Sequence, residues 1–155
     1  MPRSSPPEAA SEPLLRVEGL EVRFGQRPAV EGIDFTVAAG EVFGLIGPDG
    51  AGKTSTFHVL GGVMEASAGL VRVLGRAPRQ ARSRIGYLTQ QFSLYPDLSV
   101  AENLRYVAGL RRVPPAAFQG RRDALLRRMD LAPFAARLAG RLSGGMKQKL
   151  ALCCA

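Results

Sequence analysis

Apolar and polar side chains alternate along residues 14–37, which is the periodicity of half-buried strands. The alternating runs are residues 15–17, 20–24 and 33–37. Three glycines lie between or beside these runs and can supply close turns: Gly19, Gly25 and Gly32. The pattern therefore predicts three short antiparallel strands at the start of the domain.

A continuous apolar run over residues 42–46 follows the alternating region. Such a run suits a strand that is buried on both faces, as in a parallel sheet. The pattern after it predicts a helix over residues 53–60 and two further strands. Those strands are residues 70–74 and 85–88. Strands mixed with helices in this way indicate an α/β fold.

Helical periodicity replaces the strand pattern in residues 99–140, which we expect to form a helical insertion. Ser99 can cap a first helix, with Glu102 three residues later completing a capping box. A second helix begins near Pro114 and Pro115. The residues that it turns toward a core are Phe118, Leu125, Leu126 and Met129.

The composition is that of a globular protein, because 46% of the 155 residues are hydrophobic and 22% are charged. Residues 1–13 lack periodicity and are predicted to form a disordered tail. No window approaches eighteen consecutive apolar residues, so we expect a cytoplasmic chain that does not itself cross a membrane. Cys153 and Cys154 are adjacent and without another cysteine; we expect small buried helical residues rather than a disulfide or a zinc site.

The formal net charge of +8 comes mostly from arginine. Three arginine pairs lie in the helical region: Arg111 and Arg112, Arg121 and Arg122, Arg127 and Arg128. A solvated basic helix face, a nearby anionic membrane surface and a nucleic acid could each account for such pairs. No aromatic residues interleave with the arginines to stack on bases, so we favour the first interpretation and expect no nucleic-acid partner.

Residues 47–54 read Gly-Pro-Asp-Gly-Ala-Gly-Lys-Thr, which is the Walker A spacing of a phosphate-binding loop. Glycines let the backbone curl so that successive N–H groups point at one anion, and the following helix adds its dipole. Lys53 is expected to reach the β and γ phosphates, and Thr54 to give its hydroxyl to Mg²⁺. A chance glycine-rich turn is the alternative, but a strand before the loop and a helix after it argue against that. We therefore expect the chain to bind a nucleoside triphosphate, and ATP above all.

Residues 142–152 resemble the LSGGQ signature, and the helix after it, of ATP-binding cassette (ABC) proteins. A serine and two glycines before the amphipathic stretch 146–154 make a second anion cradle, although a simple capped turn is the alternative. In this family, the signature of one subunit closes over the γ-phosphate held by the phosphate loop of another. The resemblance thus implies a head-to-tail dimer of cassettes.

Two further positions match the family in order. Gln90 resembles the glutamine that touches Mg²⁺ and the attacking water, and Gln91 is the less favoured candidate because the family residue normally falls two positions after the apolar run that ends at Leu88. Phe24 resembles the aromatic residue that stacks on adenine, with a core phenylalanine as the alternative. Residues 85–110 look most like subunits of bacterial drug- and antibiotic-type (ABC-2) exporters.

The sequence departs from the family in three ways. Met146 stands where most members have glutamine. Asp49 stands where asparagine is commoner, so its carboxylate either lies near the phosphates or turns outward and bonds local N–H groups. Family members continue after the signature helix with an apolar strand ending in Asp-Glu and later a switch histidine. No such motif occurs in these 155 residues, and His58 is expected to be structural. We therefore expect a truncated chain with an incomplete core sheet that binds ATP better than it hydrolyses it.

The resemblance covers residues 14–155 and implies a P-loop NTPase fold of the ABC type. An antiparallel β subdomain with the phosphate-loop core is expected over residues 14–97, a helical subdomain over 98–142 and the signature helix over 143–155. The implied function is an ATP-binding subunit on the inner face of the plasma membrane that couples ATP binding and hydrolysis to export by a transmembrane permease. A soluble non-transport ABC ATPase and a non-functional remnant are the alternatives.

The residues implied in ATP binding are Phe24, Gly47, Pro48, Asp49, Gly50, Ala51, Gly52, Lys53, Thr54, Ser55, Gln90, Ser143, Gly144, Gly145 and Met146. Lys53 and Gln90 are implied in catalysis. Thr54 and Gln90 are implied as contacts of Mg²⁺.

Overall fold

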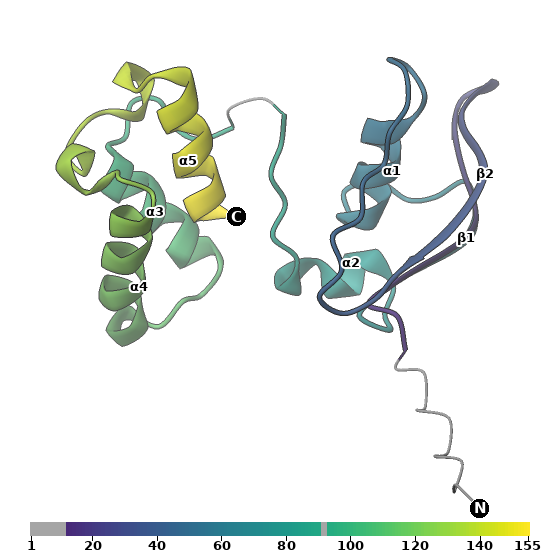
Figure 1. Cartoon of the computed structure of the whole chain (residues 1–155), viewed down its shortest axis with the longest axis horizontal. Helices are drawn as coiled ribbons and strands as arrows, with labels where there is room; N and C mark the ends of the chain where they lie inside the picture. The colour runs from purple at the N-terminus through teal and green to yellow at the C-terminus, as the bar shows by residue number, and fades with distance from the viewer. Residues whose placement is uncertain (1–11, 91–92) are drawn as a thin grey trace, which may run out of the picture. The chain divides into compact units, whose positions relative to one another are not determined.

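Figure 1 shows the computed structural model, which describes residues 12–90 and 93–155. The predicted tail therefore lies outside the described residues except for Glu12 and Pro13, and so does Gln91. The chain forms two compact units, one ending at Ile85 and one spanning Gly86–Ala155, and each is described by itself. Within the described part of the chain, no helix is long and apolar enough to cross a membrane.

The first unit is built on a three-stranded antiparallel sheet with the strand order β2-β1-β3. The strands are β1 (Leu15–Phe24), β2 (Arg27–Val37) and β3 (Ala68–Val73). The prediction of three short strands before residue 38 is wrong, because two long ones occupy that region. β1 and β2 join at a tight turn, where Gly25 has a φ of 60° that favours glycine.

Gly19 lies inside β1 and forms an irregularity rather than a turn. Its φ is 56°, the strand register shifts between Val17 and Leu20, and Val17 and Leu20 are both buried although they are three residues apart. One extra residue in a bulge keeps both side chains on the core face. The Gly19 N–H donates to Asp34 Oδ1 at 2.7 Å, which ties the bulge to β2. A glycine that the sequence suggests as a turn thus continues the strand.

The helix α1 (Lys53–Leu60) has the bounds that the sequence predicts, and it packs on the sheet (Figure 1). The buried side chains that join sheet and helix are Val17, Leu20, Val22, Val30, Val59 and Val71. After β3, the short helix α2 (Pro78–Ala81) and a single 3-10 turn, Arg82–Arg84, complete the unit. β3 begins and ends slightly before the predicted strand at 70–74.

The apolar run at residues 42–46 is not a strand, which corrects the prediction of a segment buried on both faces. Val42 is 98% exposed and Ile46 is 95% exposed, while Phe43 stacks on Phe35 with ring centroids 4.9 Å apart. The predicted strand at 85–88 is also absent. A strand needs neighbours for its ladder hydrogen bonds, and the described sheet offers none to either segment. This outcome agrees with the expectation of an incomplete core sheet.

The second unit is helical. Its helices are α3 (Val100–Leu110), α4 (Pro115–Arg128) and α5 (Gly144–Cys154), with 3-10 turns at Ala132–Phe134 and Ala139–Arg141. Their shared core contains Val100, Leu104, Leu126, Leu131, Ala139, Leu142 and Leu150, with Phe118 and Met129 packed against it. The predicted helix at Pro115 is confirmed, and so is the capping box at Ser99, where Ser99 Oγ accepts from the Glu102 N–H and Glu102 Oε2 accepts from the Ser99 N–H.

The division between the units lies upstream of the expected subdomain boundary at residues 97 and 98. Asn103 in α3 explains why the preceding loop belongs with the helices. Its side chain is fully buried, accepts from the Tyr95 N–H at 2.9 Å, and donates to the carbonyl oxygens of Tyr95, Leu98 and Ser99. These bonds satisfy a buried amide and fix the segment that leads into α3.

Candidate functional site

The phosphate loop, residues 47–54, runs from an extended segment directly into α1. Two of its glycines, Gly50 and Gly52, have φ values of 82° and 81°, which L-residues with side chains rarely adopt. The Ala51 N–H donates to Pro48 O at 3.2 Å and closes a tight turn. The glycine spacing seen in the sequence therefore corresponds to a backbone curl immediately before a helix N-terminus.

Lys53 folds its side chain back over the loop. Its ammonium donates to Gly47 O at 2.7 Å and to Pro48 O at 2.6 Å. An ammonium group has three N–H donors, so these two bonds fix its position while one donor remains for an anion above the loop. The lysine both braces the loop and contributes positive charge to it.

The first turn of α1 supplies backbone donors. The Thr56 N–H is the first to reach a helix-type acceptor, Gly52 O at 2.8 Å, and the N-cap Gly52 has no side chain to satisfy the earlier N–H groups. Within the described residues, the N–H groups of Lys53, Thr54 and Ser55 have no backbone acceptor. A helix N-terminus of this kind, with its positive dipole end, binds anions.

Thr54 and Thr56 have different environments although both lie in the first turn. Thr56 is buried and its hydroxyl donates to Gly52 O at 3.0 Å, so it is a structural residue. Thr54 is exposed, and its hydroxyl is therefore accessible to a ligand or a cation. Asp49 is also exposed, and Ser55 is partly buried.

Gly52 packs directly on β2. A Cβ built on Gly52 would lie 2.7 Å from Val30 Cγ2 and would overlap the carbonyl oxygen of Ala29. A cavity of about 460 Å³ lies at this junction, lined on the β2 side by residues 28–31 and on the loop side by Ala51, Lys53 and Thr56. A larger cavity, of about 520 Å³, lies around residues 62–66, beyond the C-terminal end of α1, away from the phosphate loop.

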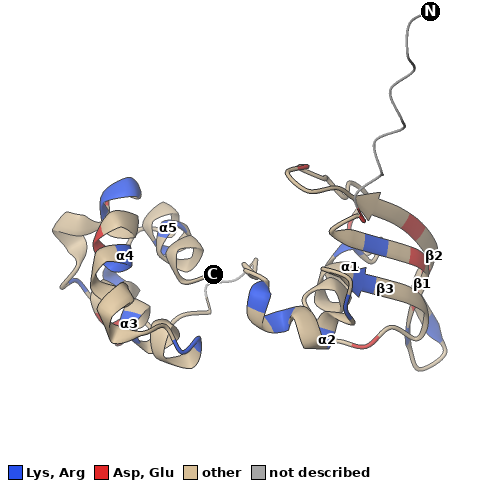
Figure 2. Ribbon diagram, turned by 90° about the horizontal axis from the view of Figure 1, so that it is seen from below, with Lys and Arg blue, Asp and Glu red and all other residues tan. Residues whose placement is uncertain are grey.

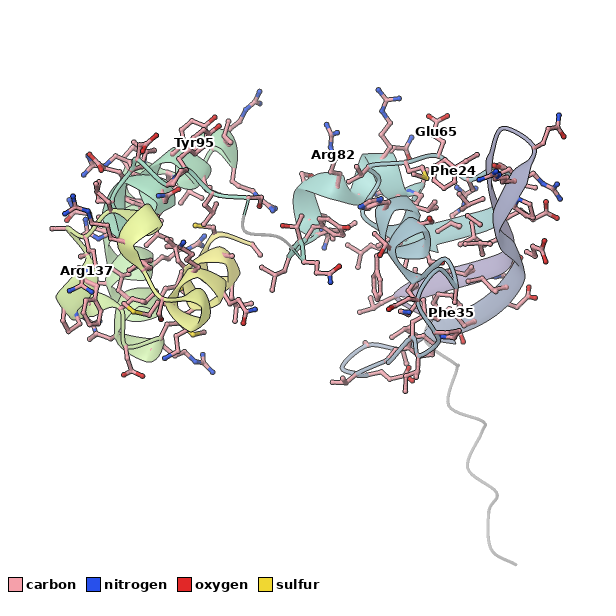
Figure 3. All side chains as sticks on the ribbon, turned by 90° about the horizontal axis from the view of Figure 1, so that it is seen from above. Phe24, Phe35, Glu65, Arg82, Tyr95 and Arg137 are labelled. Atoms are coloured by element: carbon pink, nitrogen blue, oxygen red, sulfur yellow. The ribbon has the colours of Figure 1, made fainter. Side chains whose placement is uncertain are left out.

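Phe24 lies at the end of β1, beside the hairpin turn, and is labelled in Figure 3. Its side chain is 55% exposed, so Phe24 is not a core residue. It pairs with Arg27 on β2, next to Pro28, which lines the cavity at the phosphate loop. The exposed aromatic ring is available for stacking.

The signature segment forms a second exposed helix N-terminus. Ser143 is the N-cap of α5, and its Oγ accepts from the Met146 N–H at 3.3 Å. Gly144 and Gly145 are exposed, and their N–H groups have no backbone acceptor within the described residues. Leu142 and Leu150 are buried on either side and anchor this N-terminus to the helical core. The backbone cradle is complete with Met146 in place of glutamine.

The phosphate loop, its lysine and Phe24 all belong to the first unit. Gln90 and the signature residues belong to the second unit, so the two groups of candidate residues are described separately. Gln90 is exposed, three residues before Ser93, whose Oγ accepts from Thr89 Oγ1 at 3.1 Å.

Three residues that help to shape the candidate site were not identified in the sequence. Ala29 fixes Gly52, Asp34 holds the bulge of β1, and Asn103 holds the segment after Gln90. Asn103 carries the one usable signal, since an asparagine four residues after a helix cap, among apolar neighbours, is unusual unless it is hydrogen-bonded. Ala29 carries none.

The cysteines are unsuited to chemistry at neutral pH. Burial raises the pKa of Cys153, and burial together with the neighbouring Cys153 raises the pKa of Cys154 to about 12. The thiolate is the reactive form of cysteine, so both side chains behave as small packing residues at the end of α5.

Comparison with known proteins agrees with this geometry. The family model for the ABC transporter matches residues 30–155. A probable multidrug ABC transporter ATP-binding protein of Escherichia coli K12 is 44% identical over 150 residues, covering 93% of this chain and 26% of that protein. A Nod factor export ATP-binding protein of Ralstonia nicotianae is 38% identical, covering 93% of this chain and 46% of that protein. The chain thus spans between a quarter and a half of the length of these relatives.

A solved structure of an ATP-binding subunit of an ABC transporter superposes with a TM-score of 0.82 and 32% identity. The match covers 92% of this chain and 61% of that one. Since the family model covers the phosphate loop, the helical region and the signature together, the chain belongs to the ATP-binding domains of the ABC transporter family.

Proposed function

We propose that this chain is part of an ATP-binding subunit that couples ATP binding and hydrolysis to export by a membrane permease. The observation that carries the proposal is the phosphate loop, where Lys53 is braced on Gly47 and Pro48 beside a helix N-terminus with spare N–H donors. That arrangement is suited to a triphosphate and unusual elsewhere.

The residues present fit ATP and Mg²⁺. The N–H groups at the start of α1 and the free donor of Lys53 would hold the β and γ phosphates, and the exposed Phe24 would stack on adenine. The hydroxyl of Thr54 would bind Mg²⁺, with Gln90 as a second contact. When bound, Mg²⁺ neutralises phosphate charge. The protein's own contribution is to orient the triphosphate on a rigid loop.

The names of two relatives support export as the direction of transport. The Escherichia coli and Ralstonia nicotianae proteins are named for multidrug transport and Nod factor export. By analogy, this chain would serve a transmembrane permease from the inner face of the plasma membrane. The permease would choose the cargo.

The second anion cradle, at Ser143 to Met146, supports a composite site. One nucleotide has no use for two cradles in one chain, so the signature would close over the nucleotide of a second cassette in a head-to-tail dimer. ATP binding is proposed of these 155 residues. Hydrolysis is proposed of an assembly that also supplies the Asp-Glu pair of the family.

ATP binding by the purified chain, measured by isothermal titration calorimetry with Mg²⁺ present, tests the proposal. Lys53→Ala removes both the brace and the charge, and we expect it to weaken binding by at least about tenfold, the equivalent of one charge-assisted hydrogen bond. Lys149→Ala is the matched control, because Lys149 is an exposed lysine paired with Asp130 at 3.6 Å. Equal affinity of wild type and Lys53→Ala, or no binding by the wild type, would contradict the proposal.

A further inference from the structure

The positive charge of the chain is concentrated in one unit. Residues 86–155 contain eleven Lys and Arg against four Asp and Glu, a net charge of +7, whereas residues 12–85 contain nine against eight, a net charge of +1. The same division is visible in Figure 2, where acidic and basic positions share the sheet while basic positions recur along α4. The helical unit is therefore strongly basic by itself.

Three of the four acidic groups of the helical unit have a close partner within it. Asp123 pairs with Arg122 at 2.8 Å, Asp130 pairs with Lys149 at 3.6 Å, and Glu102 accepts from the Ser99 N–H. The hydrogen bond from Arg122 lowers the pKa of Asp123. Four acidic groups cannot balance eleven basic ones, so the unit keeps its net positive charge.

Part of this charge gathers around one surface feature. An apolar cavity of about 260 Å³ lies between α3 and α4, with Leu104, Val107 and Leu125 among its lining residues. Arg111 and Arg121 line the same cavity and are exposed. Arg128 follows Arg121 by seven residues, two turns of helix, and so lies on the same face of α4.

We give the name α4 basic face to Arg121 and Arg128 on α4 together with Arg111, which follows the end of α3. Gly120 and Ala124, which lie beside these arginines along α4, are small and exposed. Guanidinium groups bind phosphate oxygens through paired N–H donors and keep their charge at every physiological pH. Long arginine side chains beside small exposed residues suit a broad anionic plane better than a narrow groove.

We propose that the α4 basic face binds the phosphate groups of anionic phospholipids. Nucleic acid fits less well, because Phe118 and Phe134 are partly buried. The guanidinium carbon of Arg122 lies 5.8 Å from the centre of the Phe118 ring, and that of Arg137 lies 4.6 Å from the centre of the Phe134 ring. Neither ring is available to stack on a base. A basic surface is attracted to an anionic leaflet only when it lies within about 10 Å of that leaflet. Binding to a permease would hold the chain that close to the membrane. Membrane proximity rests on the proposed function, but lipid binding itself requires neither ATP nor a permease.

Co-sedimentation of the full chain with vesicles tests this inference, without nucleotide. We expect binding to phosphatidylcholine vesicles that contain phosphatidylglycerol, no binding to pure phosphatidylcholine, and release at high salt. The variant Arg111→Gln, Arg121→Gln, Arg128→Gln should lower the partition coefficient about a hundredfold, since each arginine contributes about fivefold near such a surface. The matched control is Arg16→Gln, Arg23→Gln, Arg27→Gln, which removes the same charge from exposed positions of the sheet. It should change binding far less.

Several outcomes would overturn the inference. Equal losses in the two triple variants would mean that net charge alone matters, and equal binding to both kinds of vesicle would remove the lipid preference. Tighter binding to a short DNA duplex at the same salt concentration would assign the face to nucleic acid. Displacement by inorganic phosphate at matched ionic strength would indicate a site for free phosphate. Far-UV circular dichroism of both variants controls for folding, and normal ATP binding with no lipid binding would leave the proposed function intact.

Discussion

Gly52 and Ala29 approach each other so closely that Gly52 has no room for a side chain. The contact joins the phosphate loop to β2, one residue beyond Pro28 and close to the hairpin that presents Phe24. The backbone of the sheet therefore positions the last glycine before Lys53. Under the proposed function, this contact would link the adenine side of the site to its phosphate side.

Gly52→Ala should destabilise the chain by at least about 2 kcal/mol, since a left-handed φ costs about 1–2 kcal/mol for an L-residue and the overlap with Ala29 adds to it. Gly50→Ala separates the two causes, because Gly50 has the same φ but nothing within 4 Å of its added Cβ. Gly44→Ala has neither problem and should be nearly neutral. Urea unfolding measures all three; equal effects of Gly52→Ala and Gly44→Ala would refute the packing argument.

Asp49→Asn should tighten ATP binding by about twofold to fivefold if the carboxylate faces the phosphates, the range expected for one screened like charge. Glu65→Gln is the control, because it removes an exposed carboxylate beyond the far end of α1. Calorimetric titration of both variants with ATP decides the orientation. Unchanged affinity for Asp49→Asn would mean that the side chain turns away from the ligand.

Gly145→Glu should abolish ATP-dependent dimerisation while preserving the fold. A Cβ added at Gly145 meets nothing within 4 Å, and a carboxylate in the first turn of α5 interacts favourably with the helix dipole, but it would repel the γ-phosphate of a partner. Sedimentation velocity with and without ATP and Mg²⁺ measures the dimer, and Gly145→Ala is the control for size. A dimer that persists in Gly145→Glu would argue against the signature as the closing surface.

Glu102→Gln should destabilise the chain at neutral pH and matter less in acid. Hydrogen bonds to the Glu102 carboxylate, first from the Ser99 side chain and then from the Ser99 backbone N–H, hold the pKa of Glu102 below its ordinary value of 4.5. The ionised carboxylate therefore stabilises the fold above that value, and the contribution is lost as the pH falls through the lowered pKa. Thermal melts of wild type and variant at pH 7 and in acid measure the difference. Asp97→Asn removes an exposed charge near the same helix, and its difference in melting temperature from the wild type should not shrink in acid.

Asn103→Ala should cost about 3 kcal/mol, because it leaves several buried backbone groups around Tyr95 and Ser99 without their partner. Gln119→Ala, at an exposed position of α4, should change the free energy of unfolding by less than about 0.5 kcal/mol. Urea titrations compare the two. A loss at Asn103 no larger than at Gln119 would show that the amide is not a structural support for this loop.

The capping residues explain which elements the sequence predicts well. The bounds of α1, the box of Ser99 and Glu102, and the cap at Ser143 all depend on residues within four positions of each other. Short-range rules of backbone geometry and hydrogen bonding act within that distance. The candidate phosphate loop could be predicted for the same reason, because its glycines, lysine and threonine occupy one turn and the start of one helix.

The sequence by itself determined the local motifs of this protein: the phosphate loop, the signature helix, and the two helices between them, one capped by a serine and one beginning at a proline. Only the tertiary structure decided that Gly19 continues β1 through a bulge, that residues 42–46 have no hydrogen-bonded strand partner, and that Gly52 packs against Ala29. Each of these depends on a neighbour that is distant along the chain. Periodicity within one segment cannot reveal such a neighbour, because strand pairing and close backbone contact are properties of two segments together.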